Sequence, residues 1–427
     1  MTVPSQTPRV VISGLGFITS IGNDRATVAQ NLRELRHGIA PFEFLPGCDV
    51  PIKVAGTIKG FDTGSAHSAD WRWPGRYSFT REMLRSLPPH GLHAFCATEQ
   101  VIADARLTPA DLNAEDTGLF TASAGSPFVQ RVMLNQMYES RGERIAPFGV
   151  VRTISGTLNF NLGAHYRIRG AVCGFVSACA STAHAIGYAH DEIRLGRLGR
   201  VLIVGAEELT AESVLSFHGM RVLSRNPDPA TASRPFDAAR DGFVGTGGAT
   251  ALLLESAASA QTRGAPIYAE VLGWGQSADG YNLAISDPDG QGLALALRRT
   301  LRATGLAPGE VDYVNAHATS TPTGDRSEAL ALQEVFTRAG AHPAVSSTKA
   351  LTGHGLSMAA VMETAFCALA MAEGFTPGQA HLVTPSPECE GLHLPRATLP
   401  QVPGVVLKNS SGFGGSNVVL ALRRWRG

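Results

Sequence analysis

The strongest constraint on the fold is an apolar run that ends in glycines and occurs twice. RVVISGLG fills residues 9–16, and PIYAEVLGWG fills residues 266–275. After each run, strand-like stretches alternate with segments of helical periodicity, which is the pattern of a mostly parallel sheet covered by helices. The alternation predicts an α/β fold with a longer first unit and a shorter second one. An internal duplication is therefore plausible.

The elements of the two units can be placed by residue number. The first unit is expected to contain strands at 9–16, 117–124, 200–208 and 248–255 and helices at 24–35, 95–105, 127–145 and 180–195, with residues 40–90 as an irregular cap. The second is expected to contain strands at 266–275, 311–315, 405–408 and 418–423 and helices at 291–304, 325–339 and 354–373. Asp325 is expected to be an N-cap, because Asp is favoured there. We place the boundary between the two units after residue 260, so that residues 1–260 form the first unit and residues 261–427 the second.

Composition excludes several classes of function. The 36 Lys and Arg residues balance the 36 Asp and Glu residues of this 427-residue chain, so neither a nucleic-acid binder nor a membrane-surface binder is indicated. The 6 cysteines show no CxxC spacing, which favours a reducing compartment. The most apolar window, residues 356–372, contains Glu363 and predicts a buried helix rather than a membrane span. No signal segment is evident, and we expect a soluble cytoplasmic protein.

A single thiol lies at a predicted strand-to-helix turn. FVSACASTA covers residues 175–183, with Cys179 at its centre and the predicted helix directly after it. The N–H groups of a helix start favour negative charge, so the pKa of this thiol is expected to fall. A buried structural cysteine is the alternative.

Three polar segments follow predicted strands of the second unit. They are NAHATSTPTGD at 315–325, SSTKALTGHG at 346–355 and NSSGFGGSN at 409–417. Active sites of α/β sheets gather at the carboxyl ends of strands, so His317, His354 and Lys349 are expected to lie near Cys179. A metal site is not expected, because neither histidine has a carboxylate or second thiol at ligand-like spacing.

In these segments, and in SRPFDAARDGF from residue 233, the sequence resembles the β-ketoacyl-acyl carrier protein synthases, specifically the elongating subgroup with two histidines. The resemblance covers nearly the whole chain. It implies a thiolase-like duplicated five-layer αβαβα fold, a homodimer, and an acyltransferase that performs decarboxylative Claisen condensation with malonyl-acyl carrier protein. It also implies no cofactor, because phosphopantetheine of the carrier protein holds the substrates.

The same resemblance implies roles for individual residues. Cys179 matches the acyl-accepting nucleophile, and His317 and His354 match the pair at the decarboxylation site. Lys349 matches a supporting cation, and Glu363 the buried carboxylate on the following helix. Whether Lys349 orients a histidine or balances Glu363 stays open.

Further matches concern the substrate arm and the carrier protein. Thr319 and Thr321 match positions that hold pantetheine, and Phe413 matches the gate whose N–H joins that of Cys179 in an oxyanion hole. The carrier protein is acidic, so docking needs a local basic patch. Arg221 is the first candidate. Further candidates are Arg225, Arg194, Arg197 and Arg200.

Some positions depart from the family pattern. Ala318 stands where Gly is usual, Gly247 where an acidic residue is usual, and Ser411 where Phe is usual; Asn282 and Ala284 replace His and Thr. These changes concern the acyl pocket and the gate, so both fatty-acid elongation and a specialised polyketide or lipid pathway remain open.

Three rival functions can be weighed on the same residues. A coenzyme A-dependent thiolase or initiating synthase would replace one histidine, whereas the TGH at His354 is intact. A non-catalytic chain-length-factor-like subunit, which would form a heterodimer, lacks the nucleophile that Cys179 provides. A decarboxylase variant would carry Gln at this position.

Overall fold

A computed structural model describes residues 7–427 of the chain. Its main sheet has ten strands in the order β10-β9-β11-β12-β8-β1-β7-β6-β4-β5, and a second sheet pairs β2 with β3. The strands are β1 (Val10–Ile18), β2 (Ile39–Pro41), β3 (Val54–Gly56), β4 (Thr117–Ala122), β5 (Val172–Gly174), β6 (Arg200–Glu207), β7 (Gly248–Ser256), β8 (Ala269–Ala278), β9 (Tyr313–Asn315), β10 (Ala344–Ser346), β11 (Val405–Gly412) and β12 (Ser416–Arg424).

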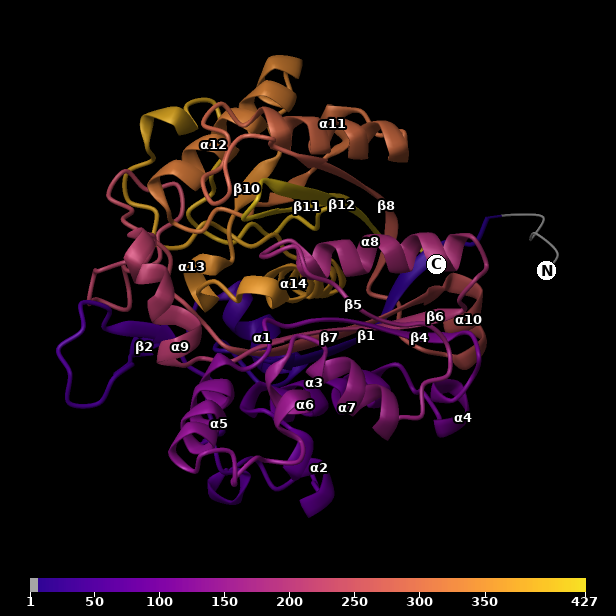
Figure 1. Cartoon of the computed structure of the whole chain (residues 1–427). Coiled ribbons are helices and arrows are strands. Elements are labelled where there is room, and N and C mark those ends of the chain that lie inside the picture. Colours follow the sequence, from indigo (N-terminus) through magenta and orange to yellow (C-terminus); the bar gives the residue numbers. More distant parts are fainter. Residues whose placement is uncertain (1–6) are drawn as a thin grey trace.

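The α-helices surround and separate the two ends of this sheet (Figure 1). They are α1 (Arg25–Arg33), α2 (Arg81–Ser86), α3 (Pro89–Asp104), α4 (Pro109–Leu112), α5 (Pro127–Glu139), α6 (Gly149–Thr153), α7 (Thr157–His165), α8 (Ser181–Arg194), α9 (Ala211–Val214), α10 (Ala257–Arg263), α11 (Gln291–Thr304), α12 (Pro322–Val335), α13 (Lys349–Thr352) and α14 (Ala359–Glu373). The expected elements are present, and most bounds move by a few residues.

The strand order repeats. From β1 outward the order is β1-β7-β6-β4-β5, which are the first, fifth, fourth, second and third strands of the first unit along the chain. From β8 outward the order is β8-β12-β11-β9-β10, which are the strands of the second unit in the same sequence of positions. In each unit the fourth and fifth strands are antiparallel, whereas the second strand pairs in parallel with the third and fourth. Residues Val10–Ile12 pair with Ala269–Val271, so the two units share one sheet. The topology is thus duplicated, and the boundary near residue 260 remains a prediction.

The sheet folds back so that its two ends face each other across two helices. In Figure 1, α8 and α14 lie between the strands of the first unit below and those of the second unit above. Helices α3 and α7 cover the lower outer face, and α11 and α12 cover the upper one. This gives five layers, as predicted.

The central helix α14 shows why the sequence buries it. Its residues from Ala359 to Met371 are all buried, including Glu363. The stretch Leu356–Glu373 is long and apolar enough to cross a membrane by composition, but 78% of it is buried inside the protein. It is a core helix between the two ends of the sheet.

Two predictions about the fold are wrong. Asp325 is not the N-cap of its helix: α12 begins at Pro322 after Thr321, and Asp325 lies in the first turn. Its carboxylate instead accepts hydrogen bonds from the N–H groups of Ser320 and Phe236. The sheet is also not mostly parallel, because β1, β7, β8 and β12 at its centre all pair antiparallel with their neighbours. The strand before Cys179, β5, ends at Gly174 and is exposed at the edge of the sheet.

Candidate active site

Cys179 lies on a sharp turn immediately before α8. Ala178 has a φ of +50°, a conformation that costs energy for a residue with a Cβ. The hydroxyl of Ser181 bridges the turn, because it accepts from the N–H of Ser177 and donates to the carbonyl of Ala178. This backbone path presents the sulfur at the start of the helix, as predicted.

The predicted fall in the pKa of Cys179 is wrong. Burial raises the pKa of the thiol to about 12, while the nearby Lys349 ammonium opposes the rise and the Glu207 and Glu363 carboxylates add to it. Removal of water from around the sulfur therefore outweighs the helix start. The thiol is neutral at rest and needs a base when it reacts.

Both predicted histidines lie beside the thiol. The Nε2 atom of His354 is 3.0 Å from the Sγ atom of Cys179. The rings of His317 and His354 are 5.3 Å apart between centroids and nearly perpendicular, at 84°. Burial, followed by the positive charge of Lys349, holds the pKa of each imidazole well below its usual range. Both rings are neutral, so His354 can accept the thiol proton.

The loop that carries His317 is fixed by a buried carboxylate that the sequence analysis missed. Glu328 of α12 accepts the N–H of His317 at 2.8 Å and the N–H of Ala318 at 2.6 Å. Asn409 of β11 also donates its amide to this carboxylate. The spacing of eleven residues between His317 and Glu328, with a helix start between them, was the only signal.

Lys349 balances Glu363. It forms an ion pair with this carboxylate, and both side chains are buried. A second lysine, Lys408 of β11, lies 2.8 Å from the other carboxylate oxygen and is fully buried. The sequence analysis did not identify Lys408, because a lysine at the end of a predicted strand is typical of a solvent-exposed edge.

Cys179, His317 and His354 line one cleft of about 880 Å³, its open mouth included. One wall is aromatic: Phe413 contacts Phe217, Phe217 contacts Phe243, and Phe243 contacts His354, with ring centroids 5.4–5.9 Å apart. Thr319 and Thr321 line the cleft, and their hydroxyls are 3.1 Å apart; their role in holding pantetheine stays a prediction.

The Phe413 loop lies against the Cys179 turn. A Cβ on Gly412 would come within 2.5 Å of the Ser177 carbonyl oxygen and 3.2 Å of the Cys179 nitrogen. Gly414 and Gly415 both have positive φ values, +81° and +75°, which a residue with a side chain adopts at a cost. Glycine is therefore needed here for close approach and for the turn.

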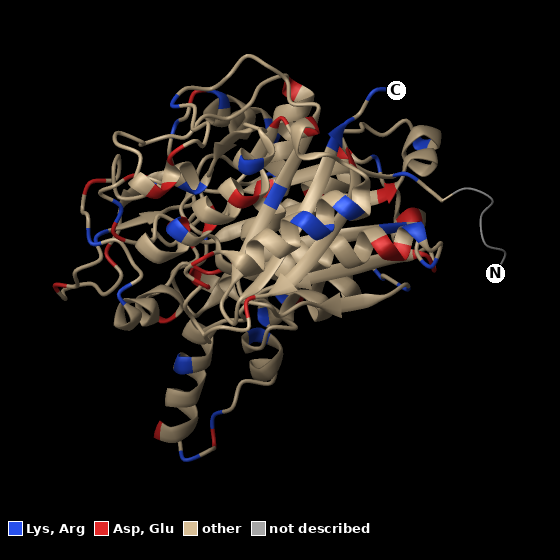
Figure 2. Cartoon of the chain, turned by 90° about the horizontal axis from the view of Figure 1, so that it is seen from above, with Lys and Arg blue, Asp and Glu red and all other residues tan. Residues whose placement is uncertain are grey.

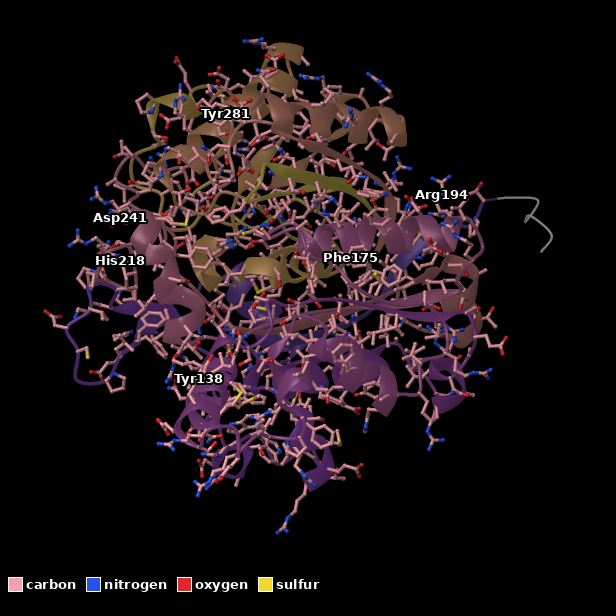
Figure 3. The ribbon with its side chains drawn as sticks, in the orientation of Figure 1. Tyr138, Phe175, Arg194, His218, Asp241 and Tyr281 are labelled. Carbon is pink, nitrogen blue, oxygen red and sulfur yellow. The ribbon has the colours of Figure 1, made fainter. Side chains whose placement is uncertain are left out.

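The candidate docking arginines separate into two groups. Arg221 is exposed and precedes Val222, which lines the cleft. By contrast, Arg197 and Arg200 pair with Glu192 and Asp111. Figure 3 shows Arg194 at the far end of α8 from His218 and Asp241, which flank the Arg221 loop in sequence. Acidic and basic residues are interspersed over the chain in Figure 2.

The structure shows the surroundings of three residues that depart from the family pattern. A Cβ at Gly247 would come within 2.9 Å of the Glu207 carbonyl oxygen and the Leu209 nitrogen, so this backbone has no room for an acidic side chain. Ala318 is buried, and its methyl group packs in the core beside α12. Asn282 accepts the N–H groups of Ala284 and Ile285 and shapes the rim of the cleft.

Ser411 lines the cleft where a Phe is usual in the family. Its hydroxyl donates to the side-chain carbonyl of Asn417, and the Asn417 amide donates to Asp279. The small side chain widens the cleft, and the three residues give it a polar wall.

Cys179, His317 and His354 offer three donor atoms that lie within 4.8 Å of one another. Chain spacing was therefore a poor guide to which donors meet in space. The set contains no carboxylate, and a metal-free site stays our prediction.

The chain is similar to known proteins over nearly its whole length. Residues 7–260 match the family model for the β-ketoacyl synthase N-terminal domain, and residues 268–383 match that for the C-terminal domain. The 3-oxoacyl-[acyl-carrier-protein] synthase 1 of Escherichia coli is 35% identical over 421 residues, which covers 97% of this chain and 99% of that protein.

Solved structures agree in fold. A β-ketoacyl synthase from Burkholderia phymatum has a TM-score of 0.88 at 28% identity and covers 98% of this chain and 100% of its own. A type II polyketide ketosynthase, solved in complex with its acyl carrier protein and bound to the hexaketide, has a TM-score of 0.86 at 25% identity, with the same coverage of 98% and 100%.

Proposed function

The chain belongs to the β-ketoacyl synthase family, and from this premise we propose that it condenses an acyl group held on Cys179 with malonyl-acyl carrier protein. The chain is then a 3-oxoacyl-[acyl-carrier-protein] synthase, an acyltransferase of fatty-acid or related polyketide synthesis. The observation that carries the assignment of roles is the 3.0 Å approach of His354 Nε2 to Cys179 Sγ inside a cleft that also contains His317.

The first half-reaction loads the enzyme. His354 accepts the thiol proton as Cys179 attacks the acyl thioester, and the N–H groups of Cys179 and Phe413 stabilise the carbonyl oxygen as it becomes negative. The carrier-protein thiol leaves with the proton. A neutral thiol beside a neutral imidazole suits this step, because the proton moves only when substrate is present.

The second half-reaction forms the carbon–carbon bond. The malonyl carbon–carboxylate bond breaks, CO₂ leaves, and the electron pair forms a thioester enolate whose oxygen accepts N–H bonds from His317 and His354. The enolate carbon attacks the acyl thioester, and the Cys179 thiolate leaves. Each such donor contributes about 3–4 kcal/mol in related oxyanion sites. Thr319 and Thr321 would hold the pantetheine arm.

Partners and location follow from the same proposal. The carrier protein would dock beside Arg221, and no resident cofactor is needed, since pantetheine carries both substrates. The outermost strand β5 has an open edge, with Val172 and Val176 exposed beside it, which suits pairing with a second copy in a homodimer. We expect the enzyme to act in the cytoplasm.

The decisive test is covalent loading. Incubation with a panel of acyl-carrier-protein thioesters, followed by intact-mass analysis, should show one acyl adduct on the wild-type chain and none on Cys179→Ala. The exposed Cys173→Ala is the matched control and should still load. Acylation of Cys179→Ala would contradict the proposal, and the preferred acyl group would separate a fatty-acid from a polyketide pathway.

A further inference from the structure

Lys408 is a buried cation with an unusual position. It lies on β11 with no exposed surface, 2.8 Å from the Glu363 carboxylate and 3.1 Å from the Ser410 hydroxyl, and it donates to the Asn409 carbonyl. Burial of an ammonium group is strongly unfavourable unless partners compensate it. A fully buried lysine in this place therefore needs an explanation.

The ion pairs near the two histidines contain more lysines than carboxylates. Lys349 and Lys408 share the single carboxylate of Glu363, one on each oxygen. One lysine is enough to neutralise Glu363, so the second ammonium has no carboxylate of its own in ion-pair contact, and the more distant Glu328 carboxylate offsets only part of its charge. The next carboxylate, Glu328, is held by the backbone N–H groups of the His317 loop and by the Asn409 amide.

The titratable and charged groups around Lys408 come from every element packed against it. They are Lys349 of α13, Glu363 and Cys367 of α14, Glu328 of α12, and the loop residues His317 and His354. Burial contributes most to the low pKa of both imidazoles, and the charges of Lys349 and Lys408 both add to it. The positive charge thus acts on the two rings that would stabilise the enolate.

We propose that Lys408 is a positioning residue of the reaction: together with Lys349 it holds positive charge beneath His317 and His354, so that both imidazoles stay neutral N–H donors. This inference rests on the proposed condensing function. It does not require Lys408 to touch the substrate. It assigns to β11 a role in addition to carrying the Phe413 loop.

The test compares charge states at constant shape. Lys408→Met removes one positive charge, Lys408→Arg keeps it, and the double variant Lys408→Met/Glu363→Gln removes one charge of each sign. The acid limb of malonyl-carrier-protein decarboxylation against pH, and the NMR titration of ¹³C-labelled histidines, report the imidazole pKa values directly.

The expected shifts have a definite sign. Loss of the Lys408 charge makes the charged imidazolium less unfavourable. The acid limb of decarboxylation and the histidine titrations should therefore both move up by about one pH unit in Lys408→Met. Lys408→Arg should keep the wild-type position whatever its rate, and the double variant should return towards it. Lower stability of Lys408→Met with an unmoved titration would mean a purely structural role and would overturn the proposal.

A folding failure does not leave the question open. If Lys408→Met does not fold, Glu363→Gln and the double variant still differ by the Lys408 charge, and the histidines should titrate about one pH unit higher in the double variant. Equal titrations would sink the proposal. A wild-type enzyme that never loads acyl groups would instead refute the condensing function, while the histidine titration would still test Lys408.

Discussion

The two central helices occupy equivalent places and do different chemistry. α8 follows the third strand of the first unit, and α14 follows the third strand of the second. The turn before α8 presents Cys179, and the loop before α14 presents His354, so the two reacting atoms meet 3.0 Å apart. Behind these turns the helices differ: α14 buries Glu363, which pairs with Lys349 and Lys408, whereas none of the buried residues of α8 is acidic.

This difference shows how two copies of one topology together form an active site. A repeated strand order brings two helix starts to the same point, and one then carries the nucleophile and the other the base. The buried ion pairs behind the site lie in the second unit, and the first unit adds the Glu207 carboxylate, which contributes to the raised pKa of Cys179. Three substitutions test this division of roles. One removes the base, one strains the contact between the two units, and one weakens the approach of the carrier protein.

Removing the base should have the largest effect. His354→Ala deletes a donor to the enolate oxygen, and we expect malonyl decarboxylation and condensation to fall by about 10²–10³-fold. Acyl loading of Cys179 should be slowed but still reach completion, as intact mass would show. The exposed His342→Ala serves as control, and unimpaired decarboxylation by His354→Ala would remove its assigned role.

Forcing the units apart should cost stability. Gly187 of α8 packs so tightly on β8 of the second unit that a Cβ would come within 2.3 Å of the Trp274 ring. We expect Gly187→Ala to lower the free energy of unfolding by about 1–3 kcal/mol, measured by denaturant titration.

A helical glycine of the first unit provides the matched control. At Gly163 of α7 a Cβ would make only ordinary contacts, the nearest at 3.8 Å from Val172, so Gly163→Ala should be neutral or stabilising. Equal destabilisation by both changes would show that the contact between the units is not what Gly187 protects.

Weakening the approach of the carrier protein should have the smallest effect. Arg221→Gln should raise the KM for acyl-carrier-protein substrates by several-fold at low salt and leave kcat unchanged, because exposed charges mainly steer association. Free acyl-pantetheine thioesters should react as before. Arg194→Gln, at the far end of α8, should change nothing, and identical kinetics of the two variants would move the docking surface elsewhere.

Patterns in the sequence were enough for the architecture and for the reacting residues. The alternation of strands and helices, with its restart at residue 266, predicted an α/β fold of two similar units, because burial periodicity is local information. The five layers followed from the family resemblance. Cys179, His317 and His354 were found because small residues and polar motifs at strand ends are visible in the chain itself. The family match extended these motifs to the gate and to the threonines.

The remaining features depend on contacts between distant residues. The pKa of Cys179 rises because the second unit removes its water, which the residues around the turn do not reveal. Lys408 and Glu328 become part of the site only when β11, α12 and α14 pack together. Asp325 was assigned to a cap because one of its buried partners, Phe236, lies 89 residues away in the chain.

The separation of Cys179 and His354 by 175 residues has a consequence for biosynthesis. A nascent chain that has completed α8 already contains the thiol, but its base has not been synthesised. Contacts of such long range form late, since the chain between them must first fold. Proton transfer from the thiol therefore begins only when the second unit closes over the first, and the reactivity of the enzyme starts with the completion of its own chain.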